Sequence, residues 1–297
     1  MRTAEFEQWV SKTLQDVEGA LELWVPKDSP AGLGEAMRYA VLGAGKRLRP
    51  LLVMATCEAV GGQPEAALRA ACAVELIHAY SLVHDDMPCM DDDVLRRGKP
   101  TVHVQFGEAQ AMLAGDAMQA LAFEVLTPEA DQVPLALQAR LCALLARSAG
   151  HAGMAGGQAI DLASVGHPLS ETALRDMHRR KTGMLLQASV MMGAACCRAC
   201  SPATQAALSE YGSAIGLAFQ VIDDILDVTQ DSDVLGKTAG KDRDANKPTF
   251  VSVLGLESAM RHAQELRDQA HIALSTSDLT NTDWLIRLAD KVVERDS

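Results

Sequence analysis

The sequence predicts an all-α fold, and two observations carry that prediction. Ala, Leu, Met, Gln and Glu, which are strong helix formers, are abundant, while alternating runs of β-branched residues are nearly absent. Apolar residues recur at helical spacing from one end of the chain to the other. The chain has 297 residues, of which 48% are hydrophobic and 22% charged, so it can bury a substantial core. We therefore expect a bundle of helices.

Turn residues mark the breaks between the expected helices. The clearest breaks are 26–30, which holds two prolines, Gly61-Gly62, Gly166-His167-Pro168 and Ser201-Pro202. The periodic segments between the breaks predict helices over residues 3–24, 31–45, 50–61, 64–87, 103–126, 134–150, 153–163, 170–195, 202–229, 248–274 and 278–295. No linker is long or polar enough to separate domains. We expect one all-helical domain over residues 1–297.

Composition narrows the classes of partner and compartment. A net charge of −12 argues against nucleic acid, because phosphate binding needs a basic face. The first residues lack the apolar core of a signal peptide, and no run approaches transmembrane length. We expect a cytoplasmic protein without stable membrane insertion, whose seven cysteines are reduced thiols. The pair Cys197-x-x-Cys200 has no second pair or His nearby in the sequence, so we interpret it as structural.

The first acid-rich cluster follows an apolar run, 73–83. Pro88 disfavours helical geometry at Met87, which places Asp85 and Asp86 near a helix C-terminus. Carboxylates there oppose the negative end of the helix dipole unless a cation compensates them. The whole cluster reads Asp85-Asp86-Met87-Pro88-Cys89-Met90-Asp91-Asp92-Asp93. Because the preceding helix is too apolar to be exposed, a solvated acidic loop is the weaker interpretation.

The second acid-rich cluster lies on one face of a predicted helix. Its members are related by steps of three and four residues: Gln220, Asp223, Asp224 and Asp227. No basic residue lies one helical turn away, so the local sequence offers these acids no counter-charge. Crowded carboxylates on an apolar helix need a cation, and hard oxygen donors without His or Cys indicate Mg²⁺.

Basic residues gather in four places within this acidic chain. They occupy residues 45–50, 96–100, 179–183 and 235–241. Ordinary ion pairs could explain any one of these clusters, but four of them beside two metal-type acid clusters indicate diphosphate groups. Neither Gly-Lys stretch is a nucleotide P-loop, because Lys46 is followed by Arg and no Gly stands five residues before Gly236.

Taken together and in this order, the motifs resemble the trans-isoprenyl diphosphate synthase family, most closely bacterial farnesyl diphosphate synthases. The resemblance spans about residues 43–250 and rests on residues 45–50, 85–93, 96–101, 181–183, 216–220, 223–227 and 236–242. It implies an isoprenoid-synthase-type helical bundle around a deep central cavity, with the two acid clusters facing each other at its mouth. It also implies a homodimer.

The resemblance assigns roles residue by residue. It implies that Mg²⁺ is bound by Asp85, Asp86 and Asp91 on one side, with Asp85 and Asp91 bridging, and by Asp223, Asp224 and Asp227 on the other. It implies that isopentenyl diphosphate is bound by Lys46, Arg49, His78 and Arg97. It implies that the allylic diphosphate is bound by Arg96, Lys181 and Lys237. It also implies that Thr182 and Gln220 lie near a developing cation. The implied catalytic set is Asp85, Asp86, Asp91, Arg96, Lys181, Thr182, Gln220, Asp223 and Lys237.

The implied reaction is electrophilic. An allylic diphosphate ionises, isopentenyl diphosphate attacks the cation and a proton is lost, so no nucleophile or acid–base dyad is required. A farnesyl product is the main interpretation, and a geranylgeranyl or other short-chain product is its alternative. A terpene cyclase would not need a second diphosphate site. A non-catalytic synthase subunit would have lost the aspartates, whereas both acid clusters are complete here.

Product length is expected to depend on the helix before the first acid cluster. Tyr80 and Ser81 lie five and four residues before Asp85, about 6–7.5 Å along a helix. The growing prenyl chain should run past this turn. Tyr80 is the only bulky aromatic residue in that helix, so we predict that its ring forms the floor of the pocket; an ordinary core tyrosine is the alternative.

Overall fold

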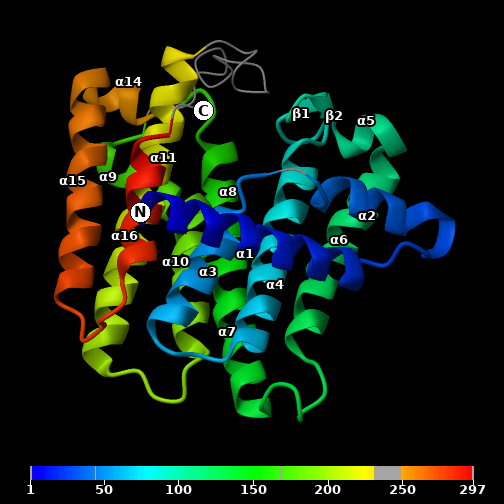
Figure 1. The fold of residues 1–297 in the computed structure, drawn as a ribbon. Coiled ribbons are helices and arrows are strands. Elements are labelled where there is room, and N and C mark those ends of the chain that lie inside the picture. The colour runs from blue at the N-terminus through cyan, green and yellow to red at the C-terminus, as the bar shows by residue number, and fades with distance from the viewer. Residues whose placement is uncertain (1, 44, 168, 231–248, 296–297) are drawn as a thin grey trace.

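The computed structural model describes residues 2–43, 45–167, 169–230 and 249–295, and helices dominate it (Figure 1). The helices are α1 (Arg2–Trp24), α2 (Leu33–Val41), α3 (Leu48–Ala59), α4 (Pro64–Asp85), α5 (Val102–Phe106), α6 (Glu108–Leu126), α7 (Leu135–Ala149), α8 (Met154–Ala163), α9 (Glu171–His178), α10 (Met184–Ala195), α11 (Pro202–Thr229), α14 (Phe250–Leu254), α15 (Leu256–Ser275) and α16 (Asp283–Val293). A 3₁₀ turn (Pro30–Gly32), a π-helical turn (Arg179–Gly183) and a hairpin of β1 (Leu95–Arg96) and β2 (Lys99–Pro100) complete the described elements. The predicted all-α class is confirmed.

Two apolar clusters form the core. The first surrounds α4 and takes side chains from α1, α2, α6 and α7; the second surrounds α11 and takes side chains from α15 and α16. Helices α3 and α10 contribute to both, because their residues are buried on opposite faces. Figure 1 shows α1 lying across the bundle formed by these helices. The clusters are therefore joined through α3 and α10.

Helix α4 is long and apolar enough to cross a membrane by length and composition alone. Its most apolar 18-residue stretch has a mean hydropathy of 1.4, which corrects the expectation that no run approaches transmembrane length. However, 72% of that stretch is buried within the protein, against α3, α6 and α10. The apolar composition of α4 is therefore explained by its place in the core.

Glycines at positive φ shorten several predicted helices. The predicted helix 31–45 ends at Val41, and Gly43 (φ 71°) and Gly45 (φ 133°) turn the chain before α3. Gly107 (φ 87°) divides the predicted helix 103–126, and Gly255 (φ 79°) separates α14 from α15. A helical residue cannot have these φ values, and periodicity alone does not reveal them. The consequence is that Lys46 lies in a non-helical stretch just before α3.

Candidate active site

The first acid cluster folds back onto the end of α4, which stops at Asp85 rather than at the predicted residue 87. The backbone N–H of Asp91 donates to the carbonyl of Asp85 (2.9 Å), and that of Asp93 donates to the carbonyl of Asp86 (3.1 Å). Burial is the main reason that the pKa of Asp85 is raised to about 6; the charges of Asp91 and Asp86 also act to raise it, while Lys181 and Arg96 act to lower it. Asp85 is therefore short of positive charge and suited to a cation.

Asp86 and Arg96 bind each other. The Arg96 guanidinium of β1 donates from Nε (2.8 Å) and Nη2 (2.5 Å) to Oδ1 of the buried Asp86, and its Nη2 lies 3.7 Å from Asp93. The ion pair ties the hairpin to the end of α4. Asp86 is predicted to bind metal and Arg96 to bind substrate. Their ion pair competes with both of these interactions.

Three of the four residues predicted to bind isopentenyl diphosphate come together. A β-carbon on Gly45 would lie 2.9 Å from Arg97 Nη1, so the loop before α3 packs directly on this guanidinium. Arg49 is buried at the start of α3, its Nε has no hydrogen-bond partner among the described residues, and burial lowers its pKa to about 10. Burial, followed by the charges of Arg49 and Arg97, lowers the pKa of His78 well below its ordinary value.

Glu75, the carboxylate whose charge acts most strongly on Arg49 and Arg97, is already paired with another cation. Glu75 accepts a 2.7 Å hydrogen bond from Arg47, which also pairs with Glu18 at 2.6 Å. Lys46 instead lies near Arg295, and burial together with repulsion from Arg295 lowers the pKa of Lys46. Two guanidinium groups beside a neutral imidazole, with Glu75 already paired, are suited to bind an anion.

The π-helical turn lies between α8 and α11 because glycines leave room for it. A β-carbon on Gly157 of α8 would lie 2.1 Å from the backbone nitrogen of Lys181, and one on Gly216 of α11 would lie 2.7 Å from the Cα of Gly183. No other residue type fits so close a backbone approach. Single π turns inside helices are frequent at functional sites. This turn carries Lys181 and Thr182, whose side chains contact Asp161 and Gln220.

The contacts of Lys181 and Thr182 agree with the predicted neighbourhood. The Thr182 hydroxyl donates to Gln220 Oε1 at 2.9 Å, so two residues predicted to face a developing cation do lie together. Lys181 Nζ donates to Asp161 Oδ2 at 2.5 Å and also faces Asp85. Lys181 therefore lies between an acid of α8 and the first acid cluster.

Sequence reasoning missed Asp161. It is buried on α8, three residues after Gln158, whose side-chain Nε2 is buried without a partner among the described residues. Residues three apart share a helix face. In the sequence, the signal that could have identified Asp161 was an amide and an acid three residues apart on an apolar helix.

The second acid cluster is partly occupied by protein groups. Asp223 pairs with the Arg295 guanidinium, which also donates to the carbonyl of Phe219 (2.7 Å) and lies 4.0 Å above its ring. No basic residue lies one helical turn from Asp223, as the sequence indicated, but the fold supplies a partner 72 positions away. Local spacing could not reveal it, because it compares only residues of one helix.

Asp224 has a structural function as well as a place in the cluster. Its buried carboxylate accepts from Gln220 Nε2 (2.8 Å) and from the backbone N–H of Phe250 (2.7 Å), which ties the start of α14 to α11. Asp227 is also buried, one turn further along α11. The predicted Lys237 lies outside the described residues.

These carboxylates fit Mg²⁺ bound jointly with a substrate. Across the described ranges, no three His, Cys, Asp or Glu side chains converge closely enough to hold a metal alone. The donors are nevertheless all oxygens, and the raised pKa of Asp85 marks a site deficient in positive charge. Mg²⁺ commonly takes one or two carboxylates and completes its shell with water and phosphate oxygens. Asp85 and Asp91 would hold such an ion.

Tyr80 is buried on α4, five residues before Asp85. Its ring packs edge-on against His84, with centroids 5.7 Å apart, and it is 9% exposed. The Ser81 hydroxyl donates to the carbonyl of His78 in its own helix (2.9 Å). Tyr80 thus carries the side-chain volume of this turn, and Ser81 adds little.

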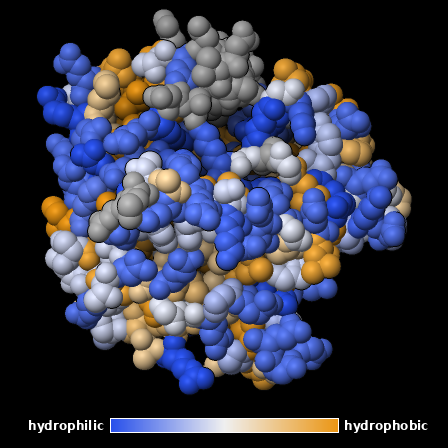
Figure 2. All heavy atoms as spheres, in the orientation of Figure 1, coloured by the Kyte–Doolittle hydropathy of each residue, from blue (hydrophilic) through white to orange (hydrophobic). Residues whose placement is uncertain are grey.

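The site opens on one edge of the bundle. The ends of α4 and α11, the hairpin and the end of α16 lie along the upper edge in Figure 1. Figure 2 shows a hollow at that edge, bordered by hydrophilic surface beside the hairpin. Residues from distant parts of the chain therefore face one opening.

Comparisons with known proteins agree with this geometry. The family profile described as "Polyprenyl synthetase" matches residues 30–282. Geranylgeranyl pyrophosphate synthase 4 of Arabidopsis thaliana is 43% identical over 294 residues, covering 98% of this chain and 78% of that protein. The crystal structure of an FPP/GFPP synthase from Zymomonas mobilis has a TM-score of 0.86 and 42% identity, and the match covers 98% of this chain and 99% of that one. A geranyltransferase from Helicobacter pylori, solved with magnesium and isoprenyl diphosphate, has a TM-score of 0.83 and 33% identity over 96% of this chain and 95% of its own.

Proposed function

The chain belongs to the polyprenyl synthetase family of trans-isoprenyl diphosphate synthases, and we propose that it joins isopentenyl diphosphate to an allylic diphosphate as a short-chain synthase. It is a prenyltransferase with the all-α isoprenoid synthase fold. One observation carries the substrate assignment. A cation-deficient acid site around Asp85 stands beside a separate anion site around Arg49 and Arg97. A terpene cyclase needs only the first site, whereas a condensing synthase needs both.

The side chains divide the work between the two substrates. Mg²⁺ held by Asp85, Asp91 and the aspartates of the second acid cluster would supply positive charge to the departing diphosphate. Lys181 and Arg96 add cationic hydrogen-bond donors on the same side. Thr182 and Gln220, which are hydrogen-bonded to each other, would supply side-chain oxygen atoms near the allylic carbon, where positive charge develops.

The second substrate is held by the basic group. Arg49 and Arg97 orient isopentenyl diphosphate, and His78, neutral because its pKa is lowered, can donate one ring hydrogen to it. The apolar helices around the site exclude water from the cation. Released diphosphate can accept the proton lost at the end, so the protein needs no dedicated base.

Two product lengths have specific support. The curated relative from Arabidopsis and its counterpart from Capsicum annuum are named geranylgeranyl synthases, which favours a C20 product over the farnesyl product expected from the sequence. The buried Tyr80 ring, one turn below Asp85, favours an earlier stop at C15. Incubating the purified protein with isopentenyl diphosphate, dimethylallyl diphosphate and Mg²⁺, then sizing the products, decides between them. The absence of any prenyl diphosphate product would contradict the proposed function itself.

Replacing Tyr80 with Ala should lengthen the product by at least one C5 unit. One helical turn is about 5.4 Å, comparable to an isoprene unit, so removing the ring opens space for a further condensation. The measurement is the product distribution by mass spectrometry. Tyr80→Phe is the matched control, because it keeps the ring and should keep the wild-type length. An active Tyr80→Ala enzyme with unchanged product length would place the floor elsewhere.

We also propose that the protein is a homodimer. The surface of α5 and α6 exposes Val104 (50%), Met112 (40%) and Leu113 (53%), an apolar face that a second copy could cover. We expect light scattering at micromolar concentration to give about twice the 31.7 kDa chain mass. Leu113→Asp should shift the mass to that of one chain, whereas Leu23→Asp, on exposed α1 surface, should not. A monomeric wild-type protein would overturn this proposal.

A further inference from the structure

A group of thiols lies at the end of the bundle opposite the active site. Cys196, Cys197 and Cys200 are in the turn between α10 and α11, and Cys57 lies near the end of α3. All four are free thiols in the structure. The proposed reaction uses none of them, and the 12 residues of α10, about 18 Å, separate them from Lys181. The sequence interpretation of Cys197-x-x-Cys200 as an isolated pair is incomplete, because folding brings Cys57 to this turn.

Cys57 and Cys196 form a closed pair. A β-carbon on Gly62 would lie 2.8 Å from Cys57 Sγ and 3.1 Å from Cys196 Cβ, so the two thiols flank one glycine. The Cys57 thiol hydrogen-bonds to the carbonyl of Gln63 (3.6 Å) as well as to Cys196. With 3% and 2% exposure, this pair has little contact with solvent. It is packed into the core and shielded from oxidants.

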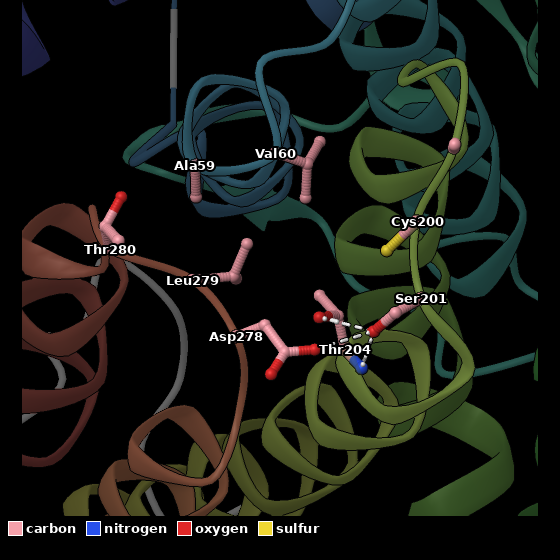
Figure 3. Close-up of a pocket in the computed structure, with 9 residues that line it drawn as sticks. Ala59, Val60, Cys200, Ser201, Thr204, Asp278, Leu279 and Thr280 are labelled. Carbon is pink, nitrogen blue, oxygen red and sulfur yellow. Dashed lines mark hydrogen bonds between the residues drawn. The ribbon is translucent and has the colours of Figure 1, made fainter.

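Cys197 and Cys200 form an open pair. Their side chains hydrogen-bond to each other, both are partly exposed, and the turn that carries them is not helical. Cys200 also lines a cavity of about 250 Å³. Figure 3 shows its sulfur directed from the turn towards the space between Val60 and Leu279. The cavity gives small molecules access to this sulfur, and the neighbouring thiol is already in contact with it.

We propose that Cys197 and Cys200 are a reversible redox site that hydrogen peroxide oxidises to a disulfide, while Cys57 and Cys196 stay reduced. The Cys200 thiolate attacks one peroxide oxygen and breaks the O–O bond, which gives a sulfenic acid and, after protonation, water. The Cys197 sulfur then attacks the sulfenic sulfur and expels a second water. Two thiols lose two electrons and two protons, and peroxide becomes two waters. A small dithiol reverses the reaction.

The experiment maps thiols in the full-length native chain. The protein is treated with hydrogen peroxide, alkylated without denaturant, and digested with trypsin, which cuts after Arg198 between the two cysteines. We expect Cys197 and Cys200 to escape alkylation, and the peptide ending at Arg198 to be linked to the peptide beginning at Ala199. Dithiothreitol should remove the link. Cys57 should become alkylated only after unfolding. A link from Cys57 to Cys196, or unchanged alkylation of Cys197 and Cys200, would overturn the proposal.

Matched variants assign the sulfurs. Cys197→Ser and Cys200→Ser should each abolish the linked peptides. Cys196→Ala should retain them, which separates Cys197 from its neighbour in the same peptide, and Cys142→Ser on α7 should also retain them. Linked peptides in Cys197→Ser would contradict the assignment. Because burial and Cys197 raise the pKa of Cys200, disulfide formation should accelerate as the pH rises from 7 to 9.

Discussion

Replacing Asp85 with Asn should reduce prenyl transfer by roughly 10²–10³-fold. The change keeps the size and the buried position of the side chain but removes the charge that would hold Mg²⁺ against the departing diphosphate. Removing the metal with EDTA should abolish turnover of the wild-type enzyme for the same reason. The measurement is the steady-state rate with both substrates over a Mg²⁺ titration, and Asp223→Asn should lose activity in parallel.

The same substitution should stabilise the metal-free protein. The pKa of Asp85 is raised from an ordinary 3.8 to about 6, so the folded state binds this proton more tightly than the unfolded state. The resulting destabilisation is absent below pH 3.8, grows as the pH rises to about 6 and is constant above it. Because Asp85 keeps some solvent contact, we expect Asp85→Asn to raise the unfolding free energy at pH 7.5 in EDTA by roughly 1–3 kcal/mol. The gain should shrink at pH 5.

Asp268→Asn is the control for both measurements. Asp268 is an exposed acid on α15 whose ion pair, within the described part of the chain, is with the adjacent Arg267, so neither rate nor stability should change appreciably. Near-normal turnover of Asp85→Asn would exclude the metal role of this carboxylate. A loss of stability in EDTA would contradict the account of its charge.

Replacing Arg49 with Gln should raise the KM for isopentenyl diphosphate by roughly 10- to 100-fold, the worth of one or two charge-assisted hydrogen bonds. The Arg49 side chain is buried and its Nε has no hydrogen-bond partner in the described part of the chain, which leaves it ready to bind an anion. Ionisation of the allylic substrate should be little affected, because Lys181 and the acid clusters face that diphosphate. Slow hydrolysis of geranyl diphosphate without isopentenyl diphosphate measures this ionisation separately.

Lys46→Ala should have a smaller effect in the same direction, because Lys46 is much more exposed than the buried Arg49. Arg267→Gln on α15 is the control and should leave both Michaelis constants unchanged. An increase mainly in the Michaelis constant of the allylic substrate would invert the assignment of the two diphosphate sites. Unchanged constants in Arg49→Gln would remove Arg49 from substrate binding.

The sequence by itself determined the helices and the groups of residues that share a helix face. Apolar periodicity predicted the all-α class and most helix positions, because burial of one face dictates that pattern. Steps of three and four residues placed Gln220 with the aspartates of α11, and the structure has Gln220 donating to Asp224. The separation of acidic from basic motifs likewise anticipated two kinds of site.

Only the tertiary structure decided which charges pair. Asp223 binds Arg295, Asp86 binds Arg96 and Lys181 binds Asp161, and none of these pairs lies within one helix. The same is true of the thiols, where Cys57 of α3 meets Cys196 after α10. Helical spacing relates residues within about two turns, whereas these contacts depend on backbone approaches such as the one that Gly157 and Gly216 permit. Partners on different helices are set by packing, and packing is determined only when the whole chain has folded.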